Sequence, residues 1–177
     1  MRVHPKKKTW LAINAVGGVA VLGSYVHGIM THPETRNALW GTIPEELQAV
    51  YGVTMWLAAG GYFLFSYYFV VRTDAEKVRF GRFGFGLINA FYALIMVTST
   101  LWMPLTFAYL ENPTPGAWLL VRADLLLVAV GTIGLTIALF TMKPRAEGLA
   151  AVLALLGLLL FAVQTAFLDP IVWPQFF

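Results

Sequence analysis

The sequence predicts an all-α integral membrane protein built as a bundle of five transmembrane helices. Five apolar stretches are each long enough to cross a hydrocarbon core about 30 Å thick. Of the 177 residues, 59% are hydrophobic and 12% are charged, whereas about 25% are charged in an ordinary soluble domain. We expect a single membrane domain, 1–177, with spans at approximately 10–30, 43–71, 84–110, 115–142 and 148–168.

The first apolar stretch follows a basic segment, Arg2 and Lys6–Lys8, as the apolar core of a signal peptide would. The core of a signal peptide has roughly 7–15 residues, and this stretch is longer. No Ala-x-Ala cleavage site follows it. We therefore expect it to stay in the membrane as the first span.

The positive charges predict how the chain is threaded. With a cytoplasmic N-terminus, only Arg36 lies on the outer face and Arg122 lies inside the fourth span. All other Lys and Arg residues fall on the cytoplasmic face, as the positive-inside rule requires. The sequence thus predicts a cytoplasmic N-terminus and an outer C-terminus, in the inner membrane of a bacterium. The net charge of +3 then reflects orientation and contact with lipid headgroups, and no nucleic-acid partner is expected.

Several chemistries are excluded by the residues that the chain lacks. There is no cysteine, which excludes thiol redox and cysteine–zinc chemistry. Every lysine lies in a tail or a link, so a retinal Schiff base is not expected. His27 is the one histidine inside a span, so a haem held by two histidines of the bundle is not expected either. We predict no metal site, and the sequence leaves the cofactor unknown.

The first span should end at His32-Pro33, because proline disfavours a helical conformation in the residue before it. Thr42 and Glu45 are spaced as a capping box, which places the start of the second helix at Ile43. The fifth helix should end at Asp169-Pro170. The aromatic tail 171–177 would then lie at the membrane interface or cover part of this or another subunit, with the interface preferred.

Small residues should face the interior of the bundle. In the first span, one face carries Asn14, Gly17, Val21, Ser24 and Gly28 at steps of three or four. Gly131 and Gly134 predict a second close approach, in the fourth span. Pro104 in the third span should kink that helix or distort one of its turns.

The candidate site consists of ionisable residues inside the spans, where hydrocarbon makes them costly. Arg122 and Asp124 in the fourth span and His27 in the first fall in the outer half of the membrane. Tyr51 and Trp102 fall in the same half. Arg122 and Asp124 are two positions apart and should not pair with each other, so we expect a separate partner for each.

Three interpretations of this site stay open. The residues form a ligand-binding cavity toward the outer face, or they form a buried network that fixes the register of the helices. In the third interpretation Arg122 simply reaches the headgroups.

The sequence contains no recognisable catalytic set, so we expect an accessory or structural subunit of a larger membrane complex, in contact with lipid and with other membrane subunits. The alternative is a binder or carrier of an apolar or amphipathic small molecule, such as a lipid, sterol, porphyrin-like compound or quinone. A third class is an enzyme acting on a lipid or quinone, with Asp124, His27 and Arg122 as acid, base and anion holder.

One family resemblance gives the binding alternative a concrete form. About 20 residues resemble the second helix of the tryptophan-rich sensory protein and peripheral benzodiazepine receptor family, through Val50-Tyr51, Met55, Ala58 and Tyr62. The resemblance implies five helices and binding of porphyrins or sterols. The family's first link, rich in proline and tryptophan, is represented only by Trp40 and Pro44, and the Asn-Trp-Ser run of its third helix is absent. No site residue is taken from the resemblance.

Overall fold

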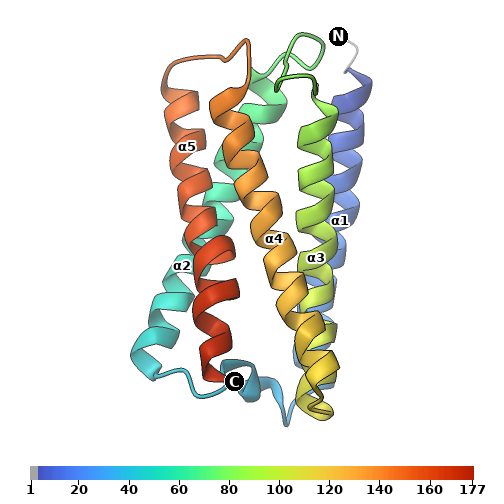
Figure 1. Cartoon of the computed structure of the whole chain (residues 1–177), viewed down its shortest axis with the longest axis vertical. Helices are drawn as coiled ribbons and strands as arrows, with labels where there is room; N and C mark the ends of the chain where they lie inside the picture. Colours follow the sequence, from blue (N-terminus) through green and yellow to red (C-terminus); the bar gives the residue numbers. More distant parts are fainter. Residues whose placement is uncertain (1–3) are drawn as a thin grey trace.

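The structure is a computed structural model that describes residues 4–177. Five helical units run along the bundle (Figure 1), and each is long and apolar enough to cross a membrane. This confirms the predicted all-helical fold with five helices long and apolar enough to span a membrane. The units are α1 (Pro5–Thr31), α2 (Glu45–Tyr67) continued by the π-helix η2 (Tyr68–Arg72), α3 (Gly86–Glu111), α4 (Pro115–Thr141), and α5 (Leu149–Ala162) continued by the π-helix η3 (Val163–Val172) and the 3₁₀ turn η4 (Trp173–Phe176).

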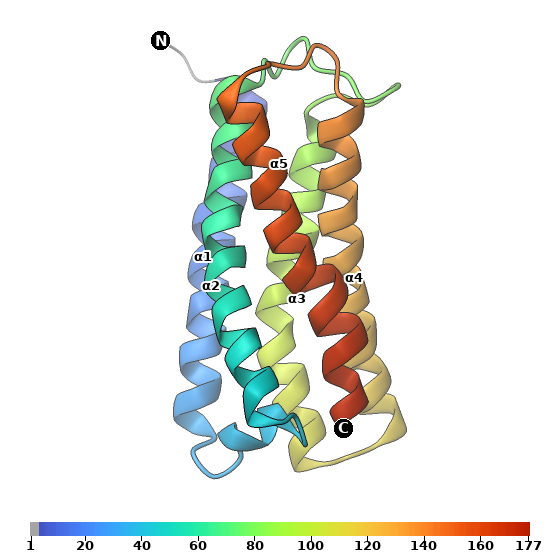
Figure 2. The same cartoon turned by 90° about the vertical axis from the view of Figure 1, so that its left-hand side faces the viewer.

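The helices are arranged around two main pairings. α3 packs against α1 on one side and α4 on the other, while α2 packs against α5. Contacts between α4 and the α5–η3 segment join the two groups (Figure 2). α1 is therefore attached mainly through α3, and the most apolar part of α1 contains no buried residue.

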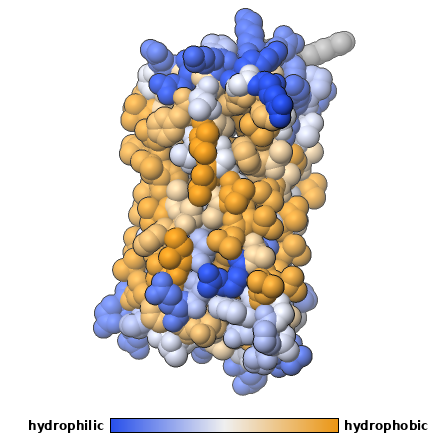
Figure 3. All heavy atoms as spheres, viewed as in Figure 1, coloured by the Kyte–Doolittle hydropathy of each residue, from blue (hydrophilic) through white to orange (hydrophobic). Residues whose placement is uncertain are grey.

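The two ends of the bundle differ in chemistry. We call the end that holds His4 and the links 72–85 and 142–148 the basic end. The opposite end, which holds the 3₁₀ turn η1 (Arg36–Trp40) and Phe177, is the aromatic end. Figure 3 shows a broad apolar band between hydrophilic residues at both ends, the arrangement expected for a chain in contact with the bilayer. That the basic end faces the cytoplasm stays a prediction from the charge distribution.

Small residues make the close helix contacts that their spacing predicts. An added methyl group on Gly17 would lie 2.7 Å from the side chain of Met96, and one on Gly28 would lie 2.9 Å from the ring of Phe107. Both contacts join α1 to α3. Gly131 packs in the same way on Ile95, and Gly134 packs on the ring of Phe91.

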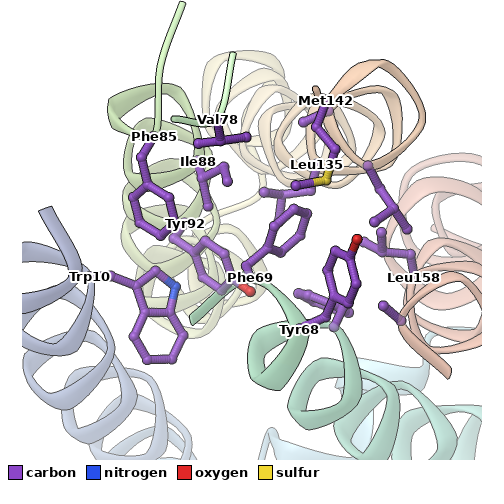
Figure 4. Packing of buried hydrophobic residues seen from close by; sticks show 14 of the residues in the cluster. Trp10, Tyr68, Phe69, Val78, Phe85, Ile88, Tyr92, Leu135, Met142 and Leu158 are labelled. Atoms are coloured by element: carbon purple, nitrogen blue, oxygen red, sulfur yellow. The ribbon is translucent and has the colours of Figure 1, made fainter. Parts of the chain in front are cut away.

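The larger apolar core lies toward the basic end (Figure 4). Tyr92 of α3 is at its centre, with the ring of Trp10 edge-on to it at 5.3 Å between centroids. The hydroxyl groups of Tyr92 and Ser66 are hydrogen-bonded at 2.8 Å. Tyr68 donates a hydrogen bond of 2.7 Å to the carbonyl oxygen of Ala146, which ties the end of α2 to the last link.

The predicted start of the second helix is wrong by two residues. α2 begins at Glu45, and Pro44 is its N-cap with an extended ψ of 148°. Thr42 does not form the predicted capping box, because its hydroxyl and its backbone N–H both donate to the carbonyl oxygen of Phe176, each at 3.0 Å. Thr42 therefore hydrogen-bonds to the end of the chain and not to the first turn of α2.

The predicted end of the fifth helix is also wrong. The chain stays helical through Asp169-Pro170 as η3 and η4. A π-helix pairs residues five apart, and the side chain of Gln164 donates to Asp169 across this interval at 2.6 Å. The tail packs on its own chain, with Trp173 buried. Of the predicted positions, it therefore takes the one that covers part of this subunit.

The remaining helix ends follow the sequence closely. α1 ends at Thr31 with His32 as its C-cap, as the His32-Pro33 pair predicts. Thr114 caps α4, accepting a hydrogen bond of 3.2 Å from the backbone N–H of Ala117. α3 stays helical through Pro104.

Candidate functional site

Asp124 and Trp102 face each other between α4 and α3. The register follows from Gly131, which packs on Ile95. Asp124 lies seven residues before Gly131, and Trp102 lies seven residues after Ile95. The two helices run antiparallel and seven residues make about two turns, so Asp124 and Trp102 lie at one depth and on the facing sides of their helices.

Three polar atoms around this position are buried without a hydrogen-bond partner. They are Oδ2 of Asp124, Nε1 of Trp102 and Oγ1 of Thr106. The side chain of Asp124 is only 5% exposed, and Thr106 is completely buried. Buried polar groups are nearly always hydrogen-bonded, and an unpaired one costs about 1–3 kcal/mol. This position therefore has unused capacity for both donors and acceptors.

Tyr25 contacts Trp102, and Asp169 lies in the C-terminal segment η3. The ring of Tyr25, from α1, lies 5.5 Å from that of Trp102. Its hydroxyl lies in the neighbourhood of both Asp124 and Asp169. Asp169 accepts the hydrogen bond from Gln164. We call Tyr25, Trp102, Thr106, Asp124, Gln164 and Asp169 the polar cluster.

An aromatic layer closes the bundle beyond the polar cluster. Trp173 is its centre, with ring centroids 6.1 Å from Trp102 and 4.2 Å from Phe177. Its indole N–H donates to the carbonyl oxygen of Leu39 at 2.9 Å. Tyr51 is buried beneath this layer and donates to the carbonyl oxygen of Leu168 at 2.8 Å. The polar cluster is thereby shielded from water at the aromatic end.

Arg122 lies on a different side of α4 from Asp124. It is four residues after Trp118, which packs on Trp173 and Phe177, so Arg122 follows Trp118 on the side turned toward the C-terminal segment. The side chain is partly exposed, but its Nε is buried without a partner. In Figure 3, hydrophilic atoms interrupt the lower half of the apolar band between α4 and the C-terminal helical segment.

Within residues 4–177, Arg122 and Asp124 take part in no ion pair. The partner expected for each is not found either, because Nε of Arg122 and Oδ2 of Asp124 have no hydrogen-bond partner.

His27 is not brought together with Arg122 and Asp124. It is exposed on α1 and lines a surface groove of about 280 Å³ with Pro104 and Glu111 of α3. Pro104 and Glu111 lie on the opposite side of α3 from Trp102 and Thr106, by helical spacing. His32 closes one end of this groove with an ion pair to Glu111 at 3.2 Å.

Comparison with protein-family models, with curated proteins and with solved structures finds no match to this chain. Within residues 4–177, no three His, Asp or Glu side chains gather as a metal site would require. The candidate site therefore stands on its geometry and its residues alone.

All five predicted site residues lie in the half of the bundle that contains the aromatic end, but His27 is exposed on the outer side of α1, apart from the other four. Sequence reasoning missed Asp169, because Asp169-Pro170 has the form of a helix end. The one available signal was Gln164, five residues earlier, which is the spacing of a π-helix.

Proposed function

We propose that the protein binds a small amphipathic molecule in the membrane and holds its polar head at the polar cluster. The observation that carries this proposal is the buried Asp124 carboxyl group, with one oxygen unpaired, opposite the equally unpaired indole N–H of Trp102. Ionisable residues at such depth are costly and are usually functional. A ligand head group that forms hydrogen bonds with both would supply the partners that these buried groups lack.

The chemistry of the cluster limits the ligand. Trp102 can only donate a hydrogen bond, while an ionised Asp124 can only accept one. A head group that carries both a hydroxyl donor and an oxygen acceptor satisfies the pair, as in a quinol, a hydroxylated sterol or a lipid alcohol. Thr106 can serve as donor or acceptor beside them. In a site closed to water, such hydrogen bonds are stronger than they are in solution.

Arg122 marks the side from which the ligand would approach. A hydrophilic patch interrupts the apolar band between α4 and the C-terminal segment (Figure 3). A guanidinium group there offers a planar set of donors for an anionic or oxygen-rich head. Lateral access suits a ligand that partitions into the bilayer, since the aromatic layer around Trp173 closes the path from the aromatic end.

The test is native mass spectrometry of the protein extracted gently from its own membrane, together with an absorbance spectrum. We expect a bound molecule in the wild type and its loss in Asp124→Asn, which keeps the shape of the side chain. Leu126→Met, on the exposed side of α4, is the matched control and should retain the molecule. A wild-type protein without any bound small molecule would contradict the proposal.

A second candidate function is an accessory subunit of a membrane complex, favoured by the exposed apolar face of α1. The outward residues Val16 and Val19 are more than 70% exposed, and α3 is the main neighbour of α1. A partner helix would bury this face. Val19→Trp should then displace companion subunits from the extracted complex without unfolding the chain. An unchanged complex, or a chain that is always alone, would exclude this face as a subunit contact.

The enzyme interpretation receives no support from the geometry. It relied on His27 acting with Asp124, and the two are on opposite sides of α3.

A further inference from the structure

A groove at the basic end opens between α3 and α4, on the side of the links. Its volume is about 330 Å³. The lining is almost entirely apolar and includes Phe80, Leu87, Phe91, Gly134, Ile137 and Thr141. The groove is remote from the polar cluster, which lies in the other half of the bundle.

Two glycines line this groove. Gly134 packs so closely on Phe91 that an added methyl group would collide with the ring. Gly81 forms part of the wall with a φ of +60°, which favours glycine, and no other group lies within 4 Å of its would-be side chain. The link therefore turns past the groove without filling it.

Cationic residues stand at the end of the groove nearest the links. Arg79 and Lys143 are joined by two backbone hydrogen bonds, of 2.8 and 2.9 Å. Arg79 directly precedes Phe80, and Lys143 follows Thr141 by two positions, so both adjoin the lining. Arg82 follows Gly81 in the same way. Within the described residues, none of these three cations takes part in an ion pair.

We propose that this groove binds an acyl chain of an anionic phospholipid, with the lipid phosphate against Arg79, Arg82 and Lys143. An apolar groove that ends at cations without an acidic partner matches the two chemistries of such a lipid. Arg79 also donates to the carbonyl oxygens of Glu76 and Val78, and Arg82 lies over the ring of Phe83. Basic pockets between transmembrane helices are known to hold anionic headgroups. Arginine adds a planar fork that suits the oxygens of a phosphate. The boundary of the apolar band with the hydrophilic end is visible in Figure 3.

The experiment uses the full chain in mixed micelles that contain equal amounts of phosphatidylglycerol and phosphatidylcholine with identical acyl chains. Native mass spectrometry counts the lipids that stay bound. We expect phosphatidylglycerol to be retained several-fold over phosphatidylcholine. The charge variant Arg82→Gln/Lys143→Gln and the groove variant Thr141→Trp should each reduce its retention at least fivefold. Arg36→Gln, which removes one positive charge at the aromatic end, should retain it as the wild type does.

Thr141 is exposed, so a tryptophan there has room, and circular dichroism should show unchanged helix content. Ile137→Trp, at a position 56% exposed, tests the same groove if the first variant does not fold. Equal retention of the two lipids by the wild type would overturn the proposal. So would full retention in a folded groove variant, or complete displacement of the lipid by inorganic phosphate, which would indicate a phosphate site without an acyl chain.

Discussion

Gly61 of α2 and Gly157 of α5 pack backbone against backbone. A methyl group on Gly61 would collide with the carbonyl oxygen of Gly157, and one on Gly157 would collide with the carbonyl oxygen of Gly61. Because neither helix can give way without separating from the other, this contact sets the distance between α2 and α5.

Gly61→Ala should therefore destabilise the bundle, by about 1–3 kcal/mol, as overpacking does. The matched control is Gly60→Ala, where no neighbouring atom lies within 4 Å of the added group. Alanine is a better helix former than glycine, so the control should be neutral or slightly stabilising. Thermal unfolding in detergent, followed by circular dichroism, measures both. Equal midpoints for the two variants would show that the contact does not limit the packing.

Tyr51→Phe should destabilise the C-terminal segment. The carbonyl oxygen of Leu168 loses the hydroxyl that now donates to it but keeps the bond from the backbone N–H of Trp173, so the cost is that of one hydrogen bond, about 0.5–1.5 kcal/mol. Tyr67→Phe is the control, because Tyr67 is 53% exposed. Hydrogen exchange read by mass spectrometry should show faster exchange in residues 163–176 for Tyr51→Phe alone. Equal exchange in both variants would mean that the hydroxyl of Tyr51 does not hold this segment.

Trp173→Phe should loosen the aromatic layer while keeping most of its apolar volume. The variant loses the hydrogen bond from the indole to Leu39, which links the chain end to the first link. We expect faster proteolysis of the link 32–44 and a lower unfolding temperature. Gln175→Ala, at an exposed position of the same tail, provides the comparison. If the link 32–44 is cut no faster in Trp173→Phe than in the wild type, the aromatic layer is held by packing alone.

Most of the fold, and less of the site, could be predicted from the sequence. The number of spans follows from long apolar stretches, and the glycines that allow close packing follow from their spacing along one face. The start of α2 at Glu45 and the continuation of the last helix past Asp169 could not be predicted, because the first link and the chain end contact each other there. Asp124 stands out by its charge alone, but its position opposite Trp102 requires the register between α3 and α4. His27 has the same polarity and depth, yet the side of α1 that it occupies separates it from the others.

The orientation of the chain can be measured directly, because the absence of cysteine allows single cysteines to be placed at will. Lys7→Cys and Lys77→Cys at the basic end should react with a membrane-impermeant maleimide only after the cells are opened. Arg36→Cys at the aromatic end should react in intact cells. This follows from the excess of Lys and Arg at the basic end. Labelling of Lys77→Cys in intact cells would reverse the predicted topology.

The central claim is that the polar cluster around Asp124 holds the head of an amphipathic molecule. A crystal structure grown in a lipid mesophase, from protein that keeps the molecules of its own membrane, tests this most directly. We expect continuous non-protein density, larger than a water, that runs from Asp124 and Trp102 toward Arg122. A cluster that contains only an ordered water, with Asp124 paired to protein groups, would contradict the claim and favour a structural network.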